Sequence, residues 1–289
     1  MKKNRFVIAL FAFMLLVLSA CGNTTSKDSA AKEQKPAAAK PAPTSMILAT
    51  TTSTQDSGLL DVIIPMFEKE NNVKVKVIAV GTGEALAMGT KGEADALLVH
   101  APAAEKAVVD AGDAINYKRV MYNDFVLVGP KENPAGVSGD DIVAAFKKLA
   151  ETKSPFISRG DDSGTNKKEL AIWTTANIKP AGDWYVSTGQ GMGQTLQVAA
   201  EKKGYVLTDR ATWLAQSKNL DTLQIVVEGG KDLMNIYHVM EVNPEKHDKV
   251  NSTDAKKFVD FMVAPKTQDV IENFGKKEFG KSLFIKYTE

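Results

Sequence analysis

The 289-residue chain contains one cysteine, three histidines and almost no excess of either charge. A single cysteine cannot form a disulfide within the chain, so a hydrophobic core must stabilise the fold. The histidines, His100, His238 and His247, show no metal-ligand spacing, which argues against a zinc or manganese site. Because 36 basic residues are balanced by 35 acidic ones, there is no argument for a nucleic-acid partner.

Sequence motifs of several enzyme classes are also missing. The chain has no Gly-x-Ser-x-Gly elbow and no Gly-x-x-x-x-Gly-Lys phosphate loop, and residues 81–86 lack the third small residue of the dinucleotide fingerprint. No titratable pair is arranged for general acid–base catalysis. The sequence therefore favours a binding protein without a cofactor. An extracytoplasmic α/β enzyme, such as a phosphate-ester hydrolase, is the alternative from another class.

A long apolar run from Phe6 to Ala20 lies near the N-terminus. It is too short for a transmembrane helix, which needs roughly 20 residues. Three basic residues precede the run and small residues end it, a pattern typical of an export signal. We therefore expect residues 1–20 to be a signal peptide and the mature protein to be extracytoplasmic.

The end of this signal, Leu-Ser-Ala-Cys-Gly at residues 18–22, resembles the lipobox of bacterial lipoproteins. The resemblance implies that Cys21 becomes the lipidated first residue and anchors the protein to the cell membrane. The alternative is an ordinary secreted protein with a chance cysteine. Residues 22–45 contain no Val, Ile, Leu or aromatic residue, so we expect 21–45 to form a lipidated, disordered tether.

From Met46 onward, strand-like and helix-like segments alternate in two successive α/β units. Strand–helix–strand alternation predicts a parallel sheet with right-handed crossovers. The expected strands are 46–49, 73–80, 96–99, 122–128, 156–157, 184–187, 205–208, 223–227 and 236–242. The expected helices are 59–70, 84–91, 103–111, 140–151, 166–176, 192–202, 211–216, 254–263 and 266–274.

Four loops that lead from a strand to a helix are rich in hydroxyl groups and glycine. They are Thr-Thr-Thr-Ser-Thr at 50–54, Gly-Thr-Gly at 81–83, Ser-Arg-Gly-Asp-Asp-Ser-Gly-Thr at 158–165 and Thr-Gly-Gln-Gly at 188–191. Arg159 is the only cationic residue among them. In open α/β sheets, ligands bind where strands lead into helices, and helix N-termini attract anions. The pattern predicts a small oxyanion held by one guanidinium and neutral donors, in a cleft that closes by a hinge.

Each loop also has a simpler explanation. Arg159 could lie in a surface turn, residues 50–54 could be strand residues or helix caps, and the glycines of the other loops could serve turns alone. We expect Asp161 and Asp162 to orient their loop, cap the helix or neutralise Arg159 without touching the ligand. An aspartate facing the ligand would favour phosphate, because it would accept the proton of hydrogen phosphate. His100, at a strand end, could line the cleft, but packing or support of a loop is the expected role.

Together with Asp-Ala-Leu-Leu-Val-His at 95–100, these motifs resemble the tungstate-binding lipoproteins of ABC importers over residues 46–289. The resemblance implies a two-lobed type II periplasmic-binding-protein fold, with chain crossings near 123–126 and 235–239. Lobe I would comprise 46–124 and 238–289, and lobe II 125–237. The implied partners are tungstate, an ABC permease and its ATPase. The membrane is contacted through the lipid anchor only, and the protein is expected to be a monomer.

The resemblance also implies a set of ligand contacts from the four loops. These are Thr51, Ser53, Thr82, Arg159, Ser163, Thr165 and the backbone N–H of Gly191. Tungstate and molybdate share charge and nearly share size, so the residues themselves do not separate them. A molybdate- or phosphate-binding protein of the same fold is the alternative.

Overall fold

The computed structural model describes residues 42–287. The expected signal peptide, Cys21 and most of the expected tether lie outside the described residues. Thr44 and Ser45, which we assigned to the tether, already belong to strand β1 (Thr44–Thr51). They pair with Val73 and Lys74 of the neighbouring strand. This backbone pairing leaves no trace in a hydrophobic pattern, because both side chains are exposed.

One sheet organises the first α/β unit. β1 lies between β2 (Val73–Val80) and β3 (Ala96–Val99) and runs parallel to both, as expected. The sheet as a whole is mixed, however. β9 (Met234–Val242) is antiparallel to β3, and β4 (Ala114–Pro130) is antiparallel to β9.

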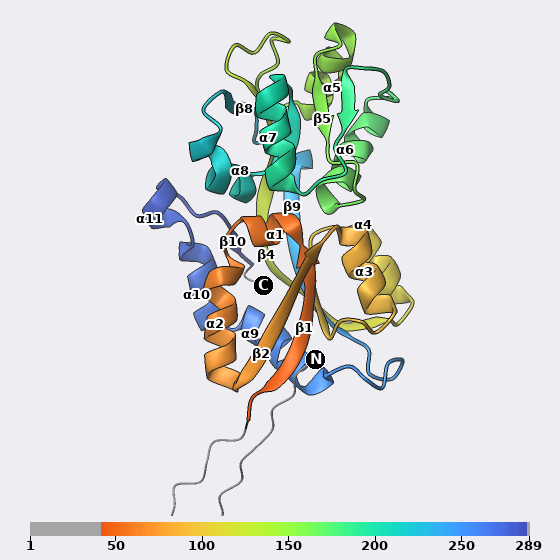
Figure 1. The fold of residues 1–289 in the computed structure, drawn as a ribbon, viewed down its shortest axis with the longest axis vertical. Helices are drawn as coiled ribbons and strands as arrows, with labels where there is room; N and C mark the ends of the chain where they lie inside the picture. The colour runs from red at the N-terminus through yellow and green to blue at the C-terminus, as the bar shows by residue number, and fades with distance from the viewer. Residues whose placement is uncertain (1–41, 288–289) are drawn as a thin grey trace, which may run out of the picture. The chain divides into compact units, whose positions relative to one another are not determined.

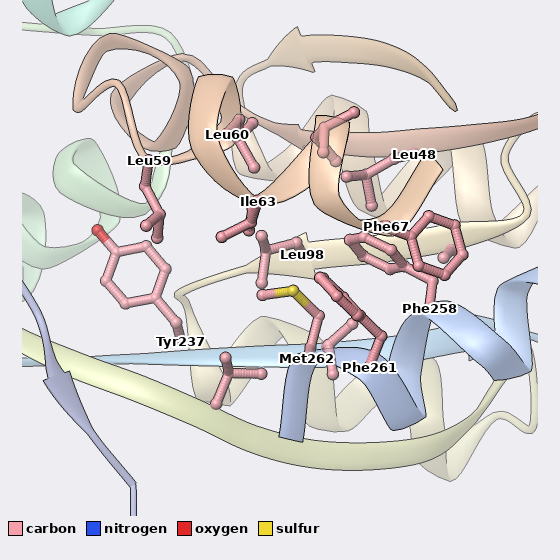
Figure 2. Packing of buried hydrophobic residues seen from close by; sticks show 14 of the residues in the cluster. Leu48, Leu59, Leu60, Ile63, Phe67, Leu98, Tyr237, Phe258, Phe261 and Met262 are labelled. Atoms are coloured by element: carbon pink, nitrogen blue, oxygen red, sulfur yellow. The ribbon is translucent and has the colours of Figure 1, made fainter. Parts of the chain in front are cut away.

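Helices cover both faces of this sheet (Figure 1). Their bounds are α1 Thr52–Asp56, α2 Leu60–Asn71, α3 Thr82–Thr90, α4 Pro102–Asp110, α9 Ser252–Val263, α10 Pro265–Asn273 and α11 Lys276–Phe279. On one face, α2 and α9 bury Phe67 and Phe258 edge to face, with ring centroids 5.1 Å apart (Figure 2). On the other face, Leu86 of α3 packs against Leu97 and Met240. Together with β10 (Ile285–Lys286), these elements form what we call lobe I.

The remaining elements build a second core. They are β5 Phe156–Ser158, β6 Tyr185–Ser187, β7 Val206–Asp209, β8 Leu223–Val227, α5 Ile142–Thr152, α6 Gly164–Thr175, α7 Met192–Lys202, α8 Arg210–Gln216 and the 3₁₀ turns Ser217–Asn219 and Lys231–Leu233. β5 and β6 are parallel. Phe146, Phe156 and Trp173 pack together in the centre in tilted and edge-to-face arrangements, with the ring centroids of Phe146 and Trp173 4.4 Å apart. We call this group lobe II.

β4 belongs to both lobes. Its residues 114–124 pair with β9, whereas 125–130 pair with β7 and β8. The change of partner falls within the region 123–126, where the resemblance placed the first crossing. The structure also describes no helix between residues 42 and 287 that is long and apolar enough to cross a membrane.

Candidate functional site

The four predicted loops meet where the two lobes touch. Figure 1 shows α1 of lobe I facing α7 and α8 of lobe II. Arg159 Nη2 donates to Thr52 Oγ1 at 2.8 Å, and the Gly193 N–H donates to Asp56 Oδ2 at 3.2 Å. The Gly83 N–H donates to the Asp162 carbonyl at 3.3 Å. Every one of these bonds joins lobe I to lobe II, so the structure has a closed cleft.

Helix N-termini surround this junction. The helices α3 and α6 begin earlier than expected, so Thr82 and Thr165 lie in first helical turns and not in loops. Ser163 is the N-cap of α6 and accepts from the Asn166 N–H at 3.1 Å. Gly191 is the N-cap of α7 and has no capping side chain. Helix N-termini from both lobes therefore direct partial positive charge to one place, which favours an anion.

Arg159 lies at the centre and is only 1% exposed. Its Nε donates to the Gln190 carbonyl at 3.4 Å, and its Nη2 forms an ion pair with Asp161 Oδ2 at 2.5 Å. Burial lowers the pKa of Arg159, while the carboxylates of Asp161, Asp209 and Asp56 oppose this shift. The guanidinium therefore stays cationic at any physiological pH. Its Nη1 is buried and has no hydrogen-bond partner within residues 42–287.

Two other predicted contacts share this property with Arg159. Thr82 Oγ1 from lobe I and Thr165 Oγ1 from lobe II are also buried without a partner in the described part of the chain. The remaining atoms of this kind belong to His238, His247, Thr267 and Gln268, outside the four loops. A buried polar group left unpaired costs about 1–3 kcal/mol. An anion accepting hydrogen bonds from Nη1 and both threonine hydroxyls would remove that cost.

The hydroxyls of Thr51 and Ser53 are already engaged inside the protein. Thr51 Oγ1 caps α1 by accepting from the Thr54 N–H, and it lies 2.7 Å from Thr54 Oγ1. Both Thr51 Oγ1 and Ser53 Oγ lie 3.0 Å from His100 Nε2. Thr51 therefore has a structural role: its hydroxyl caps α1 and is bonded to neighbouring side chains.

His100 was not among the predicted contacts, yet it lies in the site. It is 3% exposed, and its ring is stacked on Tyr237 at 4.6 Å between centroids. Burial lowers the pKa of His100 to about 4 against the effect of the Asn235 hydrogen bond, and the charge of Arg159 lowers it further. The imidazole is therefore neutral at neutral pH. Its place directly after β3, at a strand end, is the signal that could have marked it.

Asp161 takes two of the roles expected of it, whereas the Asp162 carboxylate pairs elsewhere. Asp161 Oδ2 pairs with Arg159, and Asp161 Oδ1 accepts from the Ser163 N–H at 3.2 Å. Asp162 forms an ion pair with Lys167 on the exposed side of α6. Both oxygens of Asp161 thus have donors from the protein, which leaves this carboxylate poorly placed to accept a proton from a ligand.

Two glycines allow the lobes to approach this closely. A Cβ on Gly81 would lie 2.8 Å from the Asp161 carbonyl oxygen across the cleft. A Cβ on Gly164 would lie 3.0 Å from His100 Cε1 and 3.1 Å from Thr82 Oγ1. Gly81 has an ordinary φ of −67°, so it is required for clearance and not for backbone conformation.

Comparisons with known proteins agree with this geometry. A family model described as a PBP superfamily domain matches residues 29–266. The tungstate-binding protein TupA of Peptoclostridium acidaminophilum is 47% identical over 287 residues, covering 98% of each chain. The crystal structure of the tungstate ABC transporter from Geobacter sulfurreducens has a TM-score of 0.73 and 47% identity, covering 80% of this chain and 98% of that chain. The tungstate-binding protein TupA from Desulfovibrio alaskensis G20 has a TM-score of 0.70 and 47% identity, covering 85% and 100%.

Proposed function

We propose that this chain, which belongs to the PBP (periplasmic-binding-protein) superfamily, binds tungstate between its two lobes for delivery to an ABC permease. One observation carries the proposal. Arg159 Nη1, Thr82 Oγ1 and Thr165 Oγ1 are buried donors without partners among residues 42–287, and they come from both lobes. Full-length similarity to tungstate-binding relatives identifies the anion that these donors fit.

The chemistry of the site favours a fully ionised anion over phosphate. Hydrogen phosphate carries an O–H that needs an acceptor, whereas tungstate presents oxygens that only accept. The carboxylate nearest to Arg159 is Asp161, and both of its oxygens already accept from the protein. The Asp161 carboxylate is therefore not available to a phosphate hydroxyl, which would have to donate to neutral oxygens such as those of Thr82 and Thr165.

A thermal-shift series tests this function. Tungstate at about 1,000 times its dissociation constant should stabilise the fold by about 4 kcal/mol. For a domain of this size, that raises the melting temperature by roughly 8–16 °C. Phosphate and sulfate should give no comparable shift, and a chromogenic phosphate ester should not be hydrolysed. A larger shift with molybdate would support the molybdate alternative, whereas ester turnover would favour the hydrolase reading.

We also propose that the protein is extracytoplasmic and anchored through a lipid on Cys21, following export by the signal at residues 1–20. The lipobox-like sequence at 18–22 supports this. Replacing Cys21 with serine should move the protein from the membrane fraction to the soluble extracytoplasmic fraction while tungstate binding is retained. A C21S variant that stays in the membrane pellet would contradict the lipid anchor.

The lobe boundaries at 46–124 with 238–289, and 125–237, remain part of the proposal. The hydrophobic clusters divide largely along these boundaries, although Ala211 of α8 joins the lobe I core, and β4 changes partners after Asp124. Both observations support the boundaries. Closure then couples binding to a shape that the permease and its ATPase recognise. The protein is proposed to act as a monomer, which size-exclusion chromatography with light scattering would check.

A further inference from the structure

A continuous chain of buried polar side chains connects the hydroxyls of the site to both strands that join the lobes. His100 Nδ1 lies 2.9 Å from Asn235 Oδ1 on β9, and Asn235 Nδ2 donates to Asn123 Oδ1 on β4 at 2.8 Å. Asn123 Nδ2 donates to Asp209 Oδ1 at 3.4 Å. All four side chains are at most 6% exposed, so the chain is shielded from water.

The chain closes on itself through lobe II. Asp209 is the N-cap of α8 and accepts from both the N–H and the hydroxyl of Thr212, at 2.9 and 2.7 Å. Thr212 Oγ1 also lies 3.1 Å from the Ser53 carbonyl oxygen. The ring of contacts therefore runs from Ser53 through His100, across both connecting strands, into lobe II and back to Ser53.

The direction of every bond in this chain follows from its end at Asp209. Asp209 Oδ1 accepts from a backbone N–H, so Asn123 must present its amide N–H to that oxygen. Its carbonyl oxygen then faces Asn235, whose N–H₂ donates to it and also to Tyr237 Oη at 3.1 Å. This leaves Asn235 Oδ1 toward the imidazole. His100 must therefore carry its hydrogen on Nδ1, and Nε2 is an acceptor.

An accepting Nε2 can take the hydrogen of only one of the two neighbouring hydroxyls. The nitrogen has one lone pair and two hydroxyls at 3.0 Å. Thr51 Oγ1 already accepts from the Thr54 N–H and has Thr54 Oγ1 at 2.7 Å, so donating to Nε2 completes its bonding. Ser53 Oγ also lies 3.2 Å from Thr51 Oγ1. When the N–H and the hydroxyl of Thr54 occupy both lone pairs of Thr51 Oγ1, the Ser53 hydrogen has no acceptor there and can donate to an anion. In the opposite tautomer, Nε2–H would donate to the hydroxyl oxygen of Thr51 or Ser53, so neither hydroxyl could donate to Nε2.

We propose that His100 is a positioning residue, which Asn235 holds in the Nδ1–H form so that the Ser53 hydroxyl is set to donate to the bound anion. The effect on binding rests on the proposed function. His100 itself acts through Ser53 and Thr51, and the network ties this arrangement to the strands that join the lobes. Replacing Asn235 should therefore allow His100 to adopt both tautomers and the Ser53 hydroxyl to change its orientation, without removing any group that contacts the ligand.

The tautomer is measured first, on ¹⁵N-labelled wild-type protein without ligand. The chain has only three histidines, so two-bond ¹H–¹⁵N spectra resolve the signals of the three rings. The ring signals that disappear in His100→Gln are those of His100. We expect a neutral ring with hydrogen on Nδ1 at neutral pH. A hydrogen on Nε2, or an imidazolium, would overturn the proposal. This measurement needs no tungstate. It is made on wild-type protein, and the His100→Gln variant serves only to assign the signals.

The matched variants are Asn235→Leu and Tyr237→Phe. Asn235→Leu removes the acceptor for Nδ1–H, and we expect a mixed tautomer and about tenfold weaker tungstate binding by calorimetry. Tyr237→Phe removes only the hydroxyl at 3.1 Å from Asn235 Nδ2, and it should keep the tautomer with affinity within about twofold.

A double-mutant cycle separates positioning from a merely structural role. In a Ser53→Ala background, Asn235→Leu should change the dissociation constant by less than about twofold, because the hydroxyl through which His100 acts is gone. An undiminished tenfold effect in that background would overturn the proposal. If wild-type protein shows the Nδ1–H ring but binds no tungstate, the proposed function fails while the assigned bond directions stand.

Discussion

Replacing Arg159 with glutamine should weaken tungstate binding by between about 30-fold and about 4,000-fold. Truncating one partner of a buried, charged hydrogen-bonded contact costs about 2–5 kcal/mol, and each 1.4 kcal/mol is tenfold in affinity. Arg159 is buried, and its Nη1 has no partner in the part of the chain that the structure describes. Its Nε and Nη2 are held by Gln190, Thr52 and Asp161, so the free nitrogen is fixed in direction. Isothermal titration calorimetry measures the change.

The control is Lys167→Gln, which removes the same charge from the same segment. Lys167 pairs with the exposed carboxylate of Asp162, so its loss should alter affinity by no more than about twofold. A double variant that also changes Asp161 provides a second test. Without Arg159, the Asp161 carboxylate would repel the anion, so Arg159→Gln/Asp161→Asn should bind tungstate more tightly than Arg159→Gln alone. If Arg159→Gln binds tungstate as the wild type does, the assignment of the site is wrong.

The parts of this site that were predictable are those with local signals. Arg159, Thr82 and Thr165 each follow a strand-like run and precede a helix-like run, and the structure gives all three a buried donor without a partner in residues 42–287. A strand that leads into a helix places its loop at the sheet edge where ligands bind, whatever the tertiary contacts. Composition and position were enough to predict an anion site in these loops, whereas the individual contacts were implied by the resemblance to a known family.

The parts that escaped prediction depend on contacts between distant segments. The pairing of Asn123 with Asn235 follows from the register of β4 against β9, which no local pattern specifies. β4 itself was predicted to begin at 122 because Lys118 and Arg119 interrupt the hydrophobic pattern; in the structure it begins at Ala114. The five-residue helix α1 is too short for periodicity to show, so the sequence does not reveal the bond by which Thr51 caps it.

Adding one methyl group at Gly81 should weaken tungstate binding by about 5-fold to about 150-fold, because overpacking a tight contact costs typically 1–3 kcal/mol. The new Cβ would lie 2.8 Å from the Asp161 backbone oxygen, which cannot rotate away as a side chain would. Gly81 belongs to lobe I and Asp161 to lobe II, so the clash exists only when the cleft is closed. The melting temperature without tungstate should therefore be unchanged, and the penalty should appear only on binding.

Gly193→Ala is the matched control, since Gly193 also lies against the opposite lobe. Its Cβ would meet Asp56 Oδ2 at 3.4 Å, an ordinary contact with a side chain, so affinity should stay within about threefold.

Small-angle scattering adds a direct measure, because tungstate should compact the wild type and Gly193→Ala more fully than Gly81→Ala. If the permease recognises the closed form, Gly81→Ala saturated with tungstate should stimulate the transporter's ATPase less than wild type. Unchanged affinity and full compaction in Gly81→Ala would mean that tungstate binds without bringing Gly81 and Asp161 together, and the closed cleft could not then be what selects the anion.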